Sequence, residues 1–476
     1  MAYSKSSGKP FEYASKISHR HLVVDEEVQD YIKNCVIPFD GKDVNLNPRL
    51  IHDIKYPSKN RIENIIAVDG GYQTVAVKKN FPSSLLTYFQ FGELLLERHL
   101  LENLKAMPFI SPKDMAELKN LSPVKLVLPT KNLILKDQNN LTDAVRKVIY
   151  EFFLKKDKGK DSLLHTLYWL LFQKYKRGSN TVPQCNCGGN SFKKAVASDD
   201  FLLECDNCET KAYKLSKCPY CEEPSVLLRE DKMDKENYKW QCEKCKQDIY
   251  ITDVFRLFEA VDNELGAGGI IGYIISAVEN LLIVHIIKIL LNIKKGCINK
   301  FLLVKDGPLS FVGQTANMHK PMRALLNYIS QDNKINLVGI EKSGAFVDHA
   351  KEIQNKLKPG QVFLLDNEHI YTYVMPGNID KDIYAKTSYY SAKFIYKSKE
   401  EKVYVLTVPV DNYNYYITPE VDKLKNLEEI LLNIDLLKCD IYQDAIIPIA
   451  LVNKLISLSN YPSSNILETF SKSLVK

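Results

Sequence analysis

The sequence predicts an α/β protein built on one mixed β-sheet, and three observations lead to this prediction. A strand-rich segment occupies residues 61–97, strands and helices alternate from residue 251 onward, and two apolar runs each end at an Asp followed by Gly. Strands followed by α/β alternation are typical of a sheet with helices packed on its faces. The 476 residues are enough for about two to four domains.

Apolar periodicity and turn residues assign the individual elements. Expected strands lie at residues 65–68, 74–77, 85–91, 300–306, 335–340, 361–365, 389–396 and 403–408, and the last two form a hairpin. Expected helices lie at 28–35, 142–155, 162–175, 345–357 and 448–458, with further helical segments within 100–177 and 254–293. A meander followed by α/β alternation, with acids on two separate strands, describes an RNase H-like mixed sheet core with helical insertions.

A Cys-rich stretch interrupts this core and divides the chain. We expect an N-terminal extension at 1–60, the first part of the core with a helical insertion at 61–180, a double zinc-ribbon insertion at 181–250, and the second part of the core at 251–476. Because an insertion with its own metal centres adds little to the core of its host, we expect its removal to leave the core folded.

Eight of the eleven Cys residues occur in this insertion as four close pairs. The pairs are Cys185 and Cys187, Cys205 and Cys208, Cys218 and Cys221, and Cys242 and Cys245. Two such ligands bind one side of a tetrahedral ion, and a second pair about twenty residues on closes the site. The simplest arrangement joins the first two pairs and the last two pairs around two structural Zn²⁺ ions. A crossed arrangement, which joins the first pair to the third, stays open. Five lysines between residues 193 and 217 favour contact with a polyanion.

The two Asp-Gly sequences suggest a second kind of metal site. Asp69 and Asp306 each follow a run of β-forming apolar residues, so both carboxylates are expected at strand ends. Two carboxylates side by side repel each other unless a positive charge lies between them. Mg²⁺ or Mn²⁺, which prefer oxygen ligands, would supply that charge. The alternative is that each Asp only starts a turn.

Charge and hydropathy exclude some classes of protein and leave others open. The formal charge of +6 falls to about +2 if eight thiolates bind two Zn²⁺ ions, so global charge is no argument for nucleic acid. The apolar stretch 267–293 contains Glu279, Asn280, His285 and Lys288, which favours a buried helix over a membrane span. The polar start of the chain shows no secretory signal, and we expect a cytoplasmic protein without membrane contact. A Walker phosphate-binding sequence is absent, so the chain is not itself a motor ATPase.

Three segments resemble a known family. Ile66-Ala-Val-Asp-Gly-Gly, Val304-Lys-Asp-Gly-Pro-Leu and Val338-Gly-Ile-Glu-Lys-Ser are similar, in order and in strand context, to the three best-marked motifs of the NurA family of DNA nucleases. The segment 384–394 also resembles the late strand pair of that family. The resemblance covers about residues 61–458 without the zinc insertion. It implies an RNase H-like core that cleaves DNA with Mn²⁺ or Mg²⁺, a homodimer, and partnership with HerA, a hexameric DNA translocase, in DNA-end processing and repair or in antiviral defence against phage.

Two-metal phosphodiester hydrolysis sets the expected roles of the site residues. Two cations about 3.5–4 Å apart activate a water and stabilise the attacking and leaving oxygens. Asp69 and Asp306 are expected to hold them, with a third carboxylate from the helix before the second strand. Glu279 lies in that helix and matches the acidic position of the family; Glu93, Glu259 and Glu264 are weaker candidates. Lys342, after a strand, could hold a phosphate.

The family usually carries a His in its C-terminal helix, and Asn453 stands at that place here. An amide oxygen is a weaker ligand than imidazole or carboxylate, so the alternatives for this position are Asp440, Asp444, Asp366 and His369. The departure also keeps a second class of function in view, a DNA-binding or assembly subunit on a degenerate nuclease fold that docks on a motor ATPase. An RNA-directed enzyme of the same fold is a third.

Overall fold

The computed structural model describes residues 16–35, 41, 43–78, 80, 83–99, 124–156, 161–176, 192–194, 201–208, 210–293, 296–439, 445–458 and 463–474. Within these residues, nine strands form one large sheet. In spatial order they are β1 (Ile51–Asp53), β13 (Gln361–Leu364), β14 (Ser391–Lys397), β15 (Val403–Pro409), β12 (Asn336–Glu341), β11 (Phe301–Asp306), β2 (Asn64–Lys78), β3 (Ser84–Glu97) and β4 (Val124–Lys131).

The sheet is mixed, which confirms the predicted α/β class. Strands β2, β3 and β4 form an antiparallel meander, and β11 runs parallel to both β2 and β12. The remaining strands β15, β14, β13 and β1 add in antiparallel fashion beyond β12, including the predicted β14–β15 hairpin. The parallel strands in the middle are almost wholly apolar because helices cover both of their faces.

The structure corrects the prediction that the first strand ends at Asp69. Strand β2 continues without a break through Asp69, Gly70 and Gly71 to its end at Lys78, and pairs with β3 along its whole length. The two glycines do not form a turn. They allow neighbouring parts of the protein to approach the strand closely, because they have no Cβ. A Cβ on Gly70 would lie 2.8 Å from the ring of Phe91, and one on Gly71 would lie 3.3 Å from the carbonyl oxygen of Ile456.

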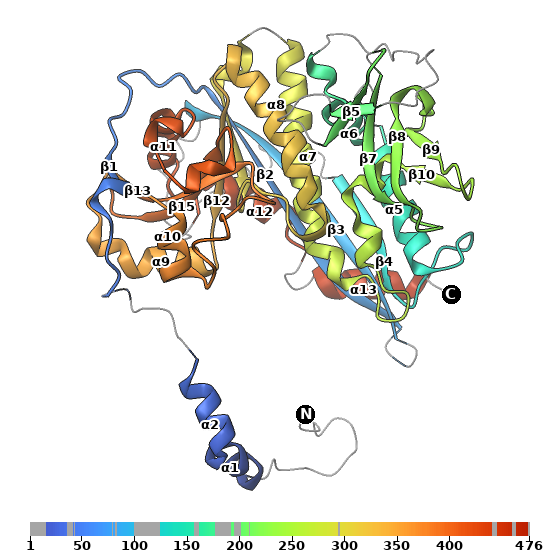
Figure 1. The fold of residues 1–476 in the computed structure, drawn as a ribbon, viewed down its shortest axis with the longest axis horizontal. Helices are drawn as coiled ribbons and strands as arrows, with labels where there is room; N and C mark the ends of the chain where they lie inside the picture. The colour runs from blue at the N-terminus through green and yellow to red at the C-terminus, as the bar shows by residue number, and fades with distance from the viewer. Residues whose placement is uncertain are drawn as a thin grey trace.

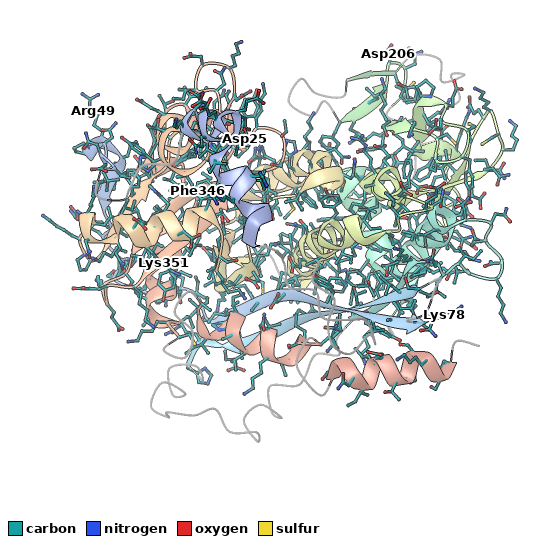
Figure 2. All side chains as sticks on the ribbon, turned by 90° about the horizontal axis from the view of Figure 1, so that it is seen from below. Asp25, Arg49, Lys78, Asp206, Phe346 and Lys351 are labelled. Atoms are coloured by element: carbon teal, nitrogen blue, oxygen red, sulfur yellow. The ribbon has the colours of Figure 1, made fainter. Side chains whose placement is uncertain are left out.

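Helices cover the two faces of the sheet. They are α5 (Leu141–Leu154), α6 (Leu163–Leu171), α7 (Ile271–Ile293), α8 (His319–Asp332), α9 (Ala345–Ile353), α10 (Asn367–His369), α11 (Leu427–Leu436), α12 (Ile447–Ile456) and α13 (Ser463–Leu474). In Figure 1, α7 and α8 cross the middle of the sheet. Figure 2 shows α13 below the end of β2 marked by Lys78, on the side opposite the yellow-green α7. Gly70 faces α7, whereas Gly71 and Gly92 face α12, so these helices lie on opposite faces.

Helix α7 is the apolar stretch that raised the question of a membrane span. By length and composition the helical stretch Gly268–Ile293 could cross a membrane, but 78% of its most apolar window is buried inside the protein. The prediction of a buried helix is therefore confirmed. Two of its polar residues have partners: Lys288 binds the exposed Asp161 at 2.6 Å, and in the core His285 Nδ1 lies 2.7 Å from the hydroxyl of Thr166.

Elements with the clearest periodicity were predicted best. Helices α5, α6, α9 and α12 and strands β11, β12 and β13 lie close to their expected positions. Strand β4 falls in a segment that we expected to be helical, and β1 lies inside the expected N-terminal extension but pairs with β13. Earlier in that extension, α1 (Lys16–Val24) and α2 (Glu26–Lys33) lie away from the rest of the chain (Figure 1).

The described part of the Cys-rich segment forms two small sheets. One has the order β5 (Phe192–Lys194), β6 (Leu202–Cys205), β7 (Lys211–Lys217) and β8 (Pro224–Arg229), and the other pairs β9 (Lys239–Gln241) with β10 (Asp248–Tyr250). We call residues 201–250 the zinc module. Its apolar side chains belong to the same buried cluster as α5, α6 and α7.

Polar contacts also tie the zinc module to the helices. Arg146 of α5 donates to the Asp248 carbonyl at 3.2 Å, and the ring of Tyr150 stacks on Tyr250 with 4.3 Å between centroids. Glu230, wholly buried in the module, pairs with Lys174 after α6. Losing one partner of a buried ion pair costs about 3–5 kcal/mol. These contacts argue against our expectation that the insertion can be removed without harm.

Candidate active site and metal centres

The candidate active site lies where β11 ends beside β2. The parallel register pairs Val304 with Ala67 and Lys305 with Val68, so the next residues, Asp306 and Asp69, are neighbours. Strand β11 stops at this level while β2 continues, so the pairing between the two strands ends beside the two carboxylates, and we call this place the sheet opening. The sequence prediction that strand order would bring these two acids together is consistent with this register.

Asp69 is the buried member of the pair, with only 3% of its surface exposed. Its Oδ1 accepts the Gly70 N–H at 2.8 Å, and its Oδ2 has no hydrogen-bond partner among the described residues. Burial raises the pKa of Asp69 from 3.8 to about 8, and the charges of Asp306 and Glu279 add to this effect, with Lys342 opposing it. Without a cation, Asp69 therefore carries a proton at neutral pH.

Glu279 reaches the same place from α7. Its Oε2 lies 2.8 Å from the Lys305 ammonium, and both side chains are about 5% exposed. Burial raises the pKa of Glu279, the Lys305 ammonium opposes that shift, and the charge of Asp306 adds to it. Next to it, Asn280 fixes the helix, because its amide donates to the Ser310 carbonyl at 2.9 Å and accepts from the Tyr390 hydroxyl at 2.5 Å.

Lys342 lies at the solvent side of the site. It follows β12 and its ammonium lies 2.6 Å from Asp306 Oδ2, with the Lys342 side chain 29% exposed. We expected this residue to bind phosphate, and in this structure its partner is the second of the two Asp residues. A half-exposed ammonium of this kind can exchange a carboxylate for a phosphate oxygen at low cost.

A third acid–lysine pair was missed by the sequence analysis. Glu341 precedes Lys342 at the end of β12, and both of its oxygens contact the Lys393 ammonium, at 2.8 and 3.0 Å. Lys393 of β14 is 1% exposed and its ammonium lies 3.5 Å from the centroid of the Phe346 ring. The available signal was one lysine inside an apolar strand, which is costly unless the charge is paired.

The expected fourth metal ligand makes no hydrogen bond to the acids among the described residues. Asn453 is exposed on α12, and among the described residues it makes no side-chain hydrogen bond to Asp69 or Asp306. Two of its alternatives have other partners: Asp366 accepts the backbone N–H of His369, and His369 Nε2 lies 2.9 Å from His349 Nε2. Asp440 and Asp444 lie outside the described residues.

The donor set at the sheet opening fits a hard cation. Asp69 offers a buried oxygen without a donor, and the Asp306 carboxylate lies beside it. Carboxylate oxygens are the ligands that Mg²⁺ and Mn²⁺ prefer. Of the weaker candidates for a metal ligand, Glu259 is less suited because it lies away from this site. Its carboxylate pairs with the Arg256 guanidinium at a distance of 2.5 Å. Glu93 faces the same side of the sheet as Lys305, because both pair with Val68.

The second metal centre consists of Cys218, Cys221, Cys242 and Cys245. Their sulfur atoms all lie within 4.8 Å of one another, and in the part of the chain that the structure describes this is the only such group of Cys, His, Asp or Glu. The third and fourth Cys pairs therefore belong together, which excludes the crossed arrangement. Four thiols in this spacing suit a tetrahedral ion such as Zn²⁺, and no position is left for a substrate.

The backbone of each Cys pair is folded into the same small loop. The N–H of Cys218 donates to the carbonyl five residues later at 2.8 Å, and that of Cys242 does the same at 3.0 Å. The N–H of Cys205 makes the equivalent bond to Thr210 at 2.9 Å, so this pair has the shape of a metal ligand pair too. Its expected partners, Cys185 and Cys187, lie outside the described residues.

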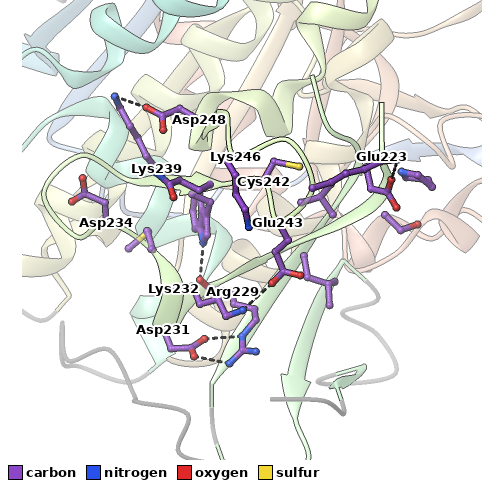
Figure 3. A pocket seen from close by; sticks show the side chains of 18 residues that line it. Glu223, Arg229, Asp231, Lys232, Asp234, Lys239, Cys242, Glu243, Lys246 and Asp248 are labelled. Atoms are coloured by element: carbon purple, nitrogen blue, oxygen red, sulfur yellow. Dashed lines mark hydrogen bonds and ion pairs between the residues drawn. The ribbon is translucent and has the colours of Figure 1, made fainter. Parts of the chain in front are cut away.

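A hollow of about 1410 Å³ lies between β8 and β9 of the zinc module (Figure 3). Its charged side chains are matched in pairs, as the dashed lines of Figure 3 show for Arg229 with Asp231 and Lys232 with Glu243. Lys239 with Asp248 and Lys244 with Glu223 are two more such pairs. The hollow is thus electrically balanced, and none of the five lysines that favoured contact with a polyanion lines it.

Comparison with known proteins does not show a family for this chain. No family model and no curated protein sequence matches the chain. Among solved structures, the NurA nuclease from Sulfolobus solfataricus aligns over 97% of this chain and 98% of its own, with 8% identity and a TM-score of 0.31. A second structure of NurA aligns over 98% and 99%, with 10% identity and a TM-score of 0.27. Scores this low carry no argument, so membership of the NurA family stays a prediction.

Proposed function

We propose that this chain is a metal-dependent deoxyribonuclease that hydrolyses phosphodiester bonds at the opening between β2 and β11. The observation that carries the proposal is Asp69, a buried carboxylate with one oxygen that lacks a donor, placed beside Asp306. Such a pair is expensive without a compensating charge. A site that binds a divalent cation and has the partly exposed side chains of Asp306 and Lys342 at its solvent side is suited to a phosphate ester.

The order of the strands supports the RNase H-like form of this proposal. An antiparallel meander of β2, β3 and β4, followed by β11 and β12 parallel to β2, is the arrangement that the sequence pattern described for such a core. The acids lie on the first strand of the meander and on its parallel neighbour. The comparisons with NurA structures add no independent weight to this point.

The residues of the site divide the chemical work between them. Asp69 Oδ2 and Asp306 hold Mg²⁺ or Mn²⁺, which when bound acts as a Lewis acid and lowers the pKa of a water ligand. Lys342, at the exposed side, exchanges Asp306 for an oxygen of the scissile phosphate and orients it. Asn280 and Tyr390 hold α7 against the sheet and so keep Glu279 in place. The two-metal form of the proposal adds a second cation at Glu279.

The partners follow from the family that the motifs resemble. We propose DNA as the substrate, a homodimer as the active assembly, and a HerA-like hexameric translocase as the motor, in end processing or phage defence. Light scattering on purified protein tests the dimer. Cleavage of linear duplex by the chain with such a motor, with and without ATP, tests the partnership.

The direct experiment is a cleavage assay on circular and linear duplex DNA, with matched RNA, in Mn²⁺ or Mg²⁺. Asp69→Asn and Asp306→Asn keep the shape of the site and remove one charge each, and a loss of about 100-fold or more in rate is expected for both. Asp332→Asn, at an exposed position at the end of α8, is the control and should cleave like the wild type. Wild-type rates in both site variants would refute the proposal.

One observation favours a second function, that of a DNA-binding subunit with little or no activity. Two of the three acids are already neutralised by lysines, and Asn453 stands exposed where the family carries a His. In that case the wild type would bind duplex in a gel-shift assay and leave it intact under every cation. The same cleavage experiment therefore decides between the two functions.

A further inference from the structure

Lys305 is a buried cation inside the group of acids. It directly precedes Asp306 in β11, is 4% exposed, and its ammonium lies 2.8 Å from Glu279 Oε2 and donates to the Asp306 carbonyl at 2.8 Å. Resting on the proposed nuclease function, we propose that Lys305 provides the positive charge at Glu279. The site then binds one divalent cation, on Asp69 and Asp306, in place of two.

Charge balance is the first argument. The carboxylates of Asp69, Glu279 and Asp306 and the ammonium groups of Lys305 and Lys342 together carry a net charge of about −1, or −2 with Glu93. Glu341 and Lys393 form a neutral pair of their own. One divalent cation brings this total to within one unit of zero, whereas a second would leave an excess of at least +2 in a largely buried place. Uncompensated buried charge costs several kcal/mol, of the order given for single buried ions.

The direction of the side chains is the second argument. Side chains alternate between the faces of a strand, so Lys305 and Val68 point to the α7 face while Asp306 and Asp69 point to the α12 face. Glu279 approaches from α7, where Gly70 leaves room for its carboxylate: a Cβ on Gly70 would lie 3.2 Å from Oε1. Glu279 is thus fixed on one side of the sheet by a lysine, and the unpartnered Oδ2 of Asp69 lies on the other.

The place of the expected fourth ligand is the third argument. In the two-metal form of the proposal, Asn453 would complete the coordination of the second cation. Asn453 is exposed, and it makes no side-chain hydrogen bond to either Asp within the described residues. With Glu279 bound to Lys305, a second cation would lack both of the ligands that distinguish it from the first.

A purely structural role for the lysine predicts something different. If Lys305 only holds α7 on the sheet, Glu279 is still free to become a ligand when the cation arrives, and two cations will bind. Both roles predict that loss of Lys305 alone destabilises the fold, since Glu279 would be left buried and unpaired. Only the number of bound cations and their affinity separate the two roles.

The experiment is a calorimetric titration of the zinc-loaded protein with Mn²⁺, with electron paramagnetic resonance of the bound ion as a second readout. We expect one Mn²⁺ per chain, without the spin coupling of a close pair. In the double variant Lys305→Met with Glu279→Gln, the buried charges disappear together, so the fold and the net charge of the site are kept. One Mn²⁺ should still bind, with an affinity within about threefold of the wild type.

The single variant Lys305→Met frees the Glu279 carboxylate from its ion pair. We expect this variant to bind a second Mn²⁺, and we expect the second ion to raise its thermal stability. Lys300→Met, which removes an exposed lysine paired with Glu63 near the start of the same strand, is the control and should bind one. Two Mn²⁺ ions in the wild type, or a loss of more than about tenfold in affinity in the double variant, would overturn the inference and leave the nuclease proposal standing. Failure of Asp69→Asn and Asp306→Asn to weaken Mn²⁺ binding would overturn both.

Discussion

The two candidate metal centres of this chain hold their donor atoms in opposite ways. In the zinc module, four thiols already lie within 4.8 Å of one another, and backbone hydrogen bonds fix the loop around each pair. At the sheet opening, Glu279 and Asp306 are bound to lysines, and Asp69 lacks a donor for one oxygen. The first centre is closed and belongs to the fold. The second is open, and its charges can be redistributed when substrate and cation bind.

The largest expected effect is on the closed centre. Cys242→Ser should remove the ion of this centre and lower the free energy of unfolding by about 3–5 kcal/mol, because Cys242 is buried and the module shares its apolar core with α5 and α6. Elemental analysis and urea unfolding measure both effects. Cys297→Ser, at a thiol outside the zinc module, is the control. Full stability with the ion lost would show that the module folds without metal.

The next effect concerns the open centre and its pH dependence. The pKa of Asp69 is raised from 3.8 to about 8, so the folded chain keeps a proton that the unfolded chain loses above about pH 4. Without added Mg²⁺ or Mn²⁺, the free energy of unfolding should therefore fall as pH rises from about 4 to about 8. Asp69→Asn should remove this dependence and stabilise the cation-free protein at pH 8 by several kcal/mol, since one pKa unit corresponds to about 1.4 kcal/mol.

Urea unfolding of the zinc-loaded protein at pH 5, 6, 7 and 8 measures this slope. Added Mn²⁺ should restore stability at pH 8 in the wild type and not in Asp69→Asn, because the cation takes the place of the proton. If the free energy of unfolding depends on pH in the same way in the wild type and in Asp69→Asn, then Asp69 is ionised without a cation. The closed centre should show the opposite slope, because protons compete with Zn²⁺ for the thiolates at low pH, which sharpens the contrast between the two.

A somewhat smaller effect lies outside both centres, and it serves as an internal reference. Burial lowers the pKa of His349 to about 4 and that of His369 to about 3, and the two ring nitrogens are 2.9 Å apart. Both side chains stay neutral in the folded state where the unfolded chain gains protons, so stability is lost as pH falls below about 6.5. At pH 5 the loss should be about 2 kcal/mol for each histidine.

The double variant His349→Gln with His369→Gln should lose much less stability at low pH than the wild type. Urea unfolding between pH 4.5 and 7 measures this difference. Cation binding at pH 8 should stay as in the wild type. If the free energy of unfolding of the double variant still falls steeply at low pH, carboxylates cause the loss of stability and the histidines do not. His52→Gln, on edge strand β1, is the matched control.

The smallest expected effect is that of Lys342. Its ammonium is partly exposed and pairs with Asp306, so Lys342→Gln should change stability by less than about 1 kcal/mol. Loss of a phosphate contact should raise KM for DNA by about threefold to tenfold with a smaller change in kcat. Steady-state cleavage kinetics check this. An unchanged KM would mean that Lys342 only forms an ion pair with Asp306 and does not bind the phosphate.

The sequence predicted best the features that depend on local pattern. The spacing of the last four Cys residues defined a centre that the structure assembles, and polar residues within 267–293 identified a buried helix. Asp69 and Asp306 could be expected to meet because the apolar runs before them are those of buried parallel strands.

Features that depend on tertiary packing were not readable in advance. Gly70 and Gly71 looked like a turn, and only the nearness of Phe91 and Ile456 shows that a straight strand needs them. Lys305 looked like one residue of a motif, because nothing local reveals that Glu279, 26 positions earlier, binds it. Lys393 and Glu341 are 52 positions apart and meet only through the β12–β15–β14 order of strands.

The burial of Cys218 and Cys242 also has a kinetic consequence. Both are at most 2% exposed, and the neighbouring Trp240 stacks on Phe172 with 6.3 Å between ring centroids. The other two ligands, Cys221 and Cys245, are partly exposed, so a chelator can reach the ion from their side while the contact between module and core stays closed. Release of zinc should therefore become faster as the chelator concentration rises, and the buried Cys218 and Cys242 should be the last of the four thiolates to leave the ion.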